Sequence, residues 1–153
     1  MPKEIRRLAF SHTEATKALN AYADKKKVKL PQGKVLHARF ASQGEETEDT
    51  MNFDHGNIFQ TYNVEQSKNN VVITFYEDQT LEHKYCNVKA DFVSAAMIEY
   101  CITNKVMLPK SGAKTIDITE FNICLDITMD IKVEAEEPVL SLEEDDDAEE
   151  NVL

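Results

Sequence analysis

The chain has 153 residues, which fits one ordinary domain or two half-domains that share a core. Its formal net charge of −11 is concentrated at one end, because residues 134–153 hold ten acidic residues and no Lys or Arg. Three cysteines without a CxxC spacing argue against a secreted disulfide framework. The N-terminus lacks the apolar core of a signal peptide, and no apolar run reaches the roughly 20 residues of a membrane span. We therefore expect a cytoplasmic protein without a membrane partner.

Residues 4–10 are expected to form a short strand that leads directly into a helix. Ser11 and Glu14 fit a capping box, in which a Ser side chain and a Glu three positions later satisfy free N–H groups at a helix start. The apolar positions that follow recur at helical spacing and predict one buried face. These positions are Ala15, Ala18, Leu19 and Tyr22.

Residues 18–31 (ALNAYADKKKVKLP) are repeated in residues 96–109 (AMIEYCITNKVMLP) at a constant offset of 78. Each copy predicts a helix, a Leu-Pro turn, a Gly and then a strand. The repeated lysines, Lys27 and Lys105, suit a helix end, where a cation meets the last carbonyl groups. We expect the second helix to be the more deeply buried, because additional apolar residues widen its stripe. The identical pairs are Ala18/Ala96, Tyr22/Tyr100, Lys27/Lys105, Val28/Val106, Leu30/Leu108 and Pro31/Pro109.

The remaining strands are predicted from alternation and from turn signals between them. Residues 34–41 form a strand with Leu36, Ala38 and Phe40 inward, and residues 57–65, 71–77 and 80–88 form three more. Residues 121–133 alternate apolar and polar side chains without a break, which predicts a long strand with one buried face. The apolar face of that strand is expected in the core together with Leu19, Tyr22, Met97, Tyr100, Leu30 and Leu108.

These elements predict an α+β fold built from two β-α-β-β-like repeats, with antiparallel sheet and two helices. The repeats cover about residues 4–65 and 80–133 of a single duplicated domain, residues 1–133. Residues 134–153 form a disordered acidic tail, because they are rich in acids and lack aromatic residues. Two arrangements stay open: two sheets related by a pseudo-twofold axis, or one continuous sheet covered by both helices.

No motif in the chain indicates an enzyme, and we expect no catalytic, cofactor-binding or metal-binding residues. An enzyme is the third hypothesis, and it rests only on the Asp54-His55 loop and Cys124. The four histidines lack metal-ligand spacing, and no nucleophile or phosphate-loop signature is present. The loop Asp54-His55-Gly56-Asn57 is interpreted as a turn rather than as a ligand site. Asp126 and Asp130 are interpreted as part of a solvated strand face that also carries Cys124.

The leading functional hypothesis is a non-enzymatic protein-interaction or adaptor protein. Its partner would dock at the junction of the repeats or on an apolar island in the tail, Val139, Leu140 and Leu142. The alternative is a nucleic-acid-associated regulator, because residues 1–39 carry a net charge of +7. In that case the acidic tail would compete for the same surface. The candidate polyanion-binding residues are Lys25, Lys26, Lys27, Lys29, Lys34 and Arg39.

Overall fold

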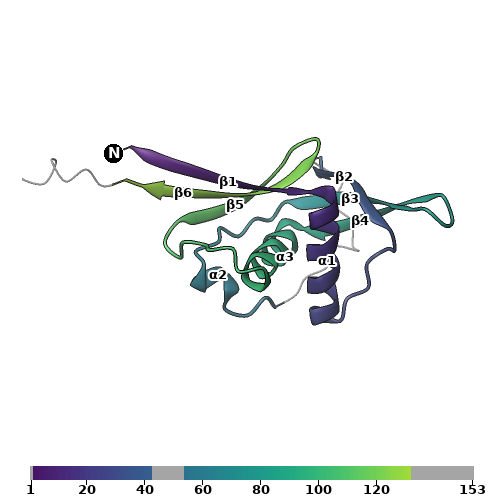
Figure 1. The fold of residues 1–153 in the computed structure, drawn as a ribbon, viewed down its shortest axis with the longest axis horizontal. Helices are drawn as coiled ribbons and strands as arrows, with labels where there is room; N and C mark the ends of the chain where they lie inside the picture. Colours follow the sequence, from purple (N-terminus) through teal and green to yellow (C-terminus); the bar gives the residue numbers. More distant parts are fainter. Residues whose placement is uncertain (1, 43–53, 132–153) are drawn as a thin grey trace, which may run out of the picture. The chain divides into compact units, whose positions relative to one another are not determined.

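A computed structural model describes residues 2–42 and 54–131, which adopt an α+β fold (Figure 1). The predicted tail, residues 134–153, and the residues 43–53 between two predicted strands lie outside the described residues. The elements are β1 (Lys3–Ser11), α1 (His12–Lys26), β2 (Lys34–Phe40), α2 (Ile58–Thr61), β3 (Asn70–Glu77), β4 (Glu82–Lys89), α3 (Ala90–Thr103), β5 (Ala113–Ile118) and β6 (Asn122–Asp130).

The strands form two antiparallel three-stranded sheets, in the orders β1-β6-β5 and β2-β3-β4. Apart from the short α2 between β2 and β3, the chain runs through a β-α-β-β order twice. The first half extends from β1 to β3, and the second half extends from β4 to β6. Each sheet combines the first strand of one half with the last two strands of the other half: β1 lies with β5 and β6, and β4 lies with β2 and β3. Neither arrangement left open by the sequence anticipates this exchange of strands.

The chain divides into two compact units. Residues 6–127 form the larger one, which contains α1, α2 and α3 and the strands between them. In the smaller unit the Ile131 N–H donates a hydrogen bond of 2.9 Å to the Pro2 carbonyl. In the same unit, Lys3 Nζ lies 3.9 Å from Asp130 Oδ1, and both side chains are more than half exposed.

Helix α1 begins with the predicted capping box. The Glu14 N–H donates to Ser11 Oγ over 3.1 Å, and the Ser11 N–H donates to Glu14 Oε1 over 2.9 Å. The predicted apolar stripe of α1 is buried. Helix α3 is buried on nearly every side, as expected, and only its last residues are exposed.

Both long helices end in the same hydrogen-bonded turn. In the first, the Val28 N–H donates to Ala23 O (2.8 Å) and the Lys27 N–H to Asp24 O (3.2 Å). In the second, Val106 and Lys105 donate to Cys101 and Ile102 over the same two distances. This pattern is a Schellman motif, and each lysine has a φ of 60°. The two repeated lysines therefore end the helices by adopting a left-handed backbone conformation.

Three sequence predictions about strands are corrected. A bulge between Val35 and His37 shifts the register of β2, so Val35 faces the core and Leu36 is half exposed. Residues 57–65 contain the short helix α2 instead of a strand, because β2 pairs directly with β3. Phe121 is 71% exposed because it lies in the tight turn before β6, where the Thr119 N–H donates to the Asn122 carbonyl.

The core lies between the helices and the inner faces of the sheets. Leu19, Tyr22 and Met97 are buried, as are the central apolar residues of β6. Tyr100, Leu30 and Leu108 are only partly buried against this core, less than predicted. The strongest apolar positions of the sequence pattern thus do form the interior.

Candidate functional site

Helices α1 and α3 pack against each other in the larger unit (Figure 1). A groove lies between them. Its volume is about 260 Å³, and its floor consists mainly of small and aromatic side chains. The two repeated tyrosines, Tyr22 from α1 and Tyr100 from α3, both line it. The floor also includes Ala18 and the exposed Ala21. The sequence repeat therefore brings its paired aromatic residues to one concave surface.

An ion pair crosses the rim of this groove. Lys25 Nζ on α1 donates to Glu99 Oε2 on α3 over 2.6 Å. The Lys25 side chain is 57% exposed, so the pair contributes about 0–1 kcal/mol to stability. The remaining rim residues are polar and come from the second turn of α1 and from the C-terminal end of α3. They are Lys17, Thr103 and Asn104.

Tyr22 also joins α1 to the segment that precedes α2. Its Oη lies 2.6 Å from His55 Nδ1, and the two rings stack with centroids 5.8 Å apart. Phe59 and Phe92 surround the same imidazole ring. Burial is the main cause that lowers the pKa of His55 and raises the pKa of Tyr22. Both rings are neutral at neutral pH, so their hydrogen bond fastens the 54–61 segment to the helices.

The loop around His55 is a turn, as the sequence predicted. Its Gly56 N–H donates to Asp54 Oδ1 over 2.9 Å, and Gly56 has a φ of +69°. The Lys26 ammonium donates to the Asp54 carbonyl over 2.9 Å and lies 5.7 Å from the Tyr22 ring centroid. Sequence spacing gave no signal for the Tyr22–His55 contact, because the partners lie 33 residues apart.

The structure does not gather the six predicted polyanion-binding residues into one cluster. Lys25 is paired with Glu99, and Lys26 is bound to the Asp54 carbonyl. Lys27 forms the C-cap of α1 and Lys29 lies exposed beyond it. Lys34 and Arg39 lie near opposite ends of β2, roughly 13 Å apart along the strand, and Arg39 donates to the Phe40 carbonyl. The predicted tail island, Val139, Leu140 and Leu142, lies outside the described residues.

The polar face of β6 is engaged by an arginine that the sequence analysis did not single out. The Arg7 guanidinium on β1 binds Asp126 through two hydrogen bonds of 2.7 and 2.8 Å, and Asp117 on β5 through a third of 2.7 Å. Cys124 is buried instead of solvated. Burial raises the pKa of its thiol and Arg7 acts in the opposite direction, so the thiol is not activated as a nucleophile.

Lys114 is fully buried on β5, and sequence reasoning missed it. Its ammonium donates to three main-chain carbonyls: Tyr62 at 2.5 Å, Gly112 at 2.8 Å and Pro109. Burial lowers the pKa of this amine. One insertion after the repeat, Lys114 corresponds to the buried Val35 of the first half. The lysine thus holds together the Leu-Pro turn and the end of α2.

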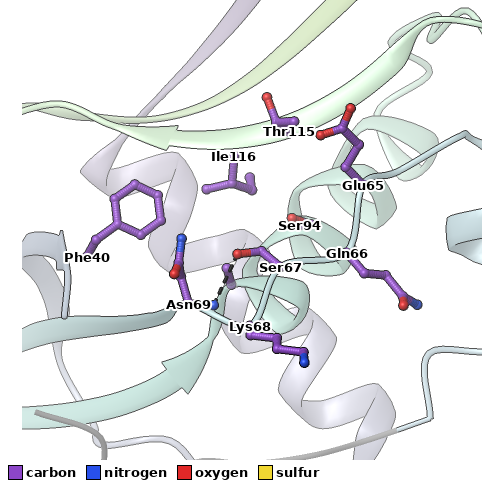
Figure 2. A pocket seen from close by; sticks show the side chains of 10 residues that line it. Phe40, Glu65, Gln66, Ser67, Lys68, Asn69, Ser94, Thr115 and Ile116 are labelled. Carbon is purple, nitrogen blue, oxygen red and sulfur yellow. Dashed lines mark hydrogen bonds between the residues drawn. The ribbon is translucent and has the colours of Figure 1, made fainter. Parts of the chain in front are cut away.

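A second and larger pocket of about 440 Å³ lies where β2, α3 and β5 meet residues 65–69. Figure 2 shows Phe40 and Ile116 near each other at one end and the side chains of Glu65 and Gln66 at the other. Ser67 Oγ accepts from the Asn69 N–H over 3.1 Å, and the Ser67 N–H donates to Asp91 Oδ1 over 2.9 Å. These bonds fix the segment against the start of α3.

Across residues 2–42 and 54–131, no group of His, Cys, Asp or Glu side chains is arranged to hold a metal ion. Cys86, Cys101 and Cys124 are free thiols, and the latter two are buried. No helix in the described part of the chain is long and apolar enough to cross a membrane. Comparison with models of protein families, with curated proteins and with solved structures gave no match.

Proposed function

We propose that this chain is a non-enzymatic protein-interaction module that receives an apolar side chain of a partner in the α1–α3 groove. The observation that carries the proposal is the groove itself, because Tyr22 and Tyr100 both line its concave and partly apolar surface. Aromatic side chains in desolvated pockets contribute most strongly to protein–protein binding. The polar rim, including the Lys25–Glu99 pair, would orient the partner segment.

We further infer that the groove lies at the junction of two duplicated units. The two halves share a β-α-β-β element order, and their sheets correspond when β1 is matched with β4. Equal hydrogen-bond distances in the two Schellman motifs support the same correspondence. On this view Tyr22 and Tyr100 are equivalent residues that the duplication placed opposite each other. The cytoplasmic location and the tail as a second docking segment stay predictions.

The proposal is tested by filling the groove. Ala21 is exposed and lines it, whereas the neighbouring Asn20 is exposed on α1 without lining it. Ala21→Trp is expected to abolish binding of partner proteins, and Asn20→Trp is the matched control. Partners are first identified by affinity purification with the full chain, and each purified partner is then titrated by calorimetry. Equal affinities for wild type, Ala21→Trp and Asn20→Trp would show that the groove is not the binding site.

A further inference from the structure

Large apolar side chains are exposed around the C-terminal end of α3. Met107 is 82% exposed, Ile102 43% and Val106 38%. Together with Leu108 and Tyr62 they line a groove of about 270 Å³ in the larger unit, hereafter the α3-end groove. Exposed apolar residues that gather in one place mark interaction surfaces.

The turn at the end of α3 does not itself require these apolar residues. The 78-residue offset matches Ile102 with Asp24 and Met107 with Lys29, and both charged residues are exposed at the end of α1. The same Schellman motif forms there with the same two hydrogen-bond distances. The apolar side chains at positions 102 and 107 are therefore not needed to end the helix.

The buried Lys114 holds both walls of the α3-end groove. Its ammonium donates to the carbonyl of Tyr62 in one wall and to the carbonyl of Pro109, in the turn that forms the other wall. The residues that follow these two are also joined, because the Asn63 side-chain amide donates to the Ser111 carbonyl over 2.9 Å. The groove is therefore formed before a partner arrives, which lowers the entropic cost of binding.

The charge around the α3-end groove is positive. Lys105 and Lys110 both line it and are exposed, and the described residues that line it include no Asp or Glu. Across the part of the chain that the structure describes, neither ammonium group forms an ion pair. Both charges are therefore available to the carboxylates of a partner.

We propose that the α3-end groove binds an acidic peptide segment of a partner protein. One apolar side chain of the segment occupies the groove, and flanking carboxylates lie against Lys105 and Lys110. Sites for small molecules usually enclose roughly 300–1,000 Å³, so the smaller volume of this groove suits a single anchoring side chain. The flexible thioether of Met107 can adapt to the shape of that side chain.

The α3-end groove shares no lining residue with the α1–α3 groove. The inference therefore goes beyond the proposed function, and the failure of either site leaves the other intact. Ala21→Trp, which fills the α1–α3 groove, should not change binding at the α3-end groove.

The apolar contribution is tested with the full chain and the fluorescein-labelled peptide EEDLLDEE, with affinity measured by fluorescence anisotropy. The peptide EEDSSDEE, which lacks the leucines, should bind at least tenfold more weakly. Met107→Ser is expected to weaken binding of EEDLLDEE about tenfold, because exposed apolar area is lost. Phe121→Ser is the matched control, since Phe121 is 71% exposed but lies in the turn before β6. Met107→Leu keeps the apolar area and should bind like wild type.

The charge contribution is tested by a pair of double variants. Lys105→Gln/Lys110→Gln is expected to weaken binding about fivefold at low salt, because two exposed ion pairs are lost, and less at high salt. Lys27→Gln/Lys29→Gln is the matched control, since it removes two exposed lysines from the equivalent turn of α1.

Three results would overturn the proposal: no binding of EEDLLDEE, equal affinity for the two peptides, or equal effects of the variants and their matched controls. Sedimentation of the chain with phosphatidylserine vesicles, without binding of EEDLLDEE, would overturn it in favour of a membrane surface.

Discussion

The helices α1 and α3 end in the same turn but are buried to very different extents. Helix α1 buries one stripe and exposes the opposite face, whereas α3 is enclosed along most of its length. Position 20 in α1 is an exposed Asn, and the matching position 98 in α3 is a fully buried Ile. The comparison shows that the helix ends depend on local hydrogen bonds, while burial depends on what the fold places around each helix.

The largest expected effect comes from exchanging residues at these matched positions. Ile98→Asn should lower the free energy of unfolding by more than about 3 kcal/mol. The substitution removes buried apolar volume and buries an amide group in a site built for an apolar side chain. Asn20→Ile should change it by less than about 0.5 kcal/mol, because the position is exposed. Urea unfolding of both variants measures the difference. Similar losses for the two would contradict the contrast between the helices.

Lys114 provides the next test, because Val35 occupies the matching position in the first half. Lys114→Val gives the second half the residue of the first. We expect a loss of about 3 kcal/mol in the free energy of unfolding, because three main-chain carbonyls lose their charged donor. Lys110→Val, at an exposed position, is the control and should have little effect. A stable Lys114→Val protein would mean that the carbonyls find other donors.

The pH dependence of stability is expected to come from two histidines of the first half, His12 and His55. Burial lowers the pKa of His12 at the start of α1 and the pKa of His55, which contacts Tyr22. The matching tyrosine of the second half, Tyr100, packs on Phe10. Unfolded histidine titrates near its ordinary value of about 6.5, so below that pH the unfolded chain binds more protons. The stability that these two histidines contribute is therefore fully present above about pH 6.5. It is lost as the pH falls from about 6.5 through their lowered pKa values in the folded protein.

The slope of that loss is measured by urea unfolding between pH 7 and pH 5. Each imidazole contributes at most about 1.4 kcal/mol per pH unit. The double variant His12→Asn/His55→Asn should show a shallower slope than wild type over this range. An unchanged slope would assign the pH dependence to other groups.

The smallest expected effect concerns the two Schellman motifs. Lys27 and Lys105 both have a φ of 60°, which a residue with a Cβ adopts at a cost and glycine adopts freely. Lys27→Gly and Lys105→Gly should each raise the free energy of unfolding by about 0.5–1 kcal/mol, and by equal amounts. Thermal unfolding of the two variants compares them. Opposite signs would show that the two turns are not equivalent.

The sequence by itself determined the local features of this protein. The capping box of Ser11 and Glu14, the buried stripe around Leu19 and Tyr22, and the alternation along β6 follow from hydrogen bonds and periodicities within one element. The two matched helix ends followed from the 78-residue repeat, although the left-handed lysine backbone did not. These features are readable because the interacting groups lie within a few residues of each other.

Only the tertiary structure decided which distant segments meet. The exchange of strands between the sheets, the bulge that turns Val35 inward and the carbonyl cage of Lys114 depend on pairing across long stretches of chain. The same holds for the Tyr22–His55 contact and for the strand register that pairs Lys34 with Tyr76. Register moves in steps of one residue, and each step exchanges the two faces of a strand. Local sequence does not specify that step, because it is the packing of the whole sheet against the core that selects it.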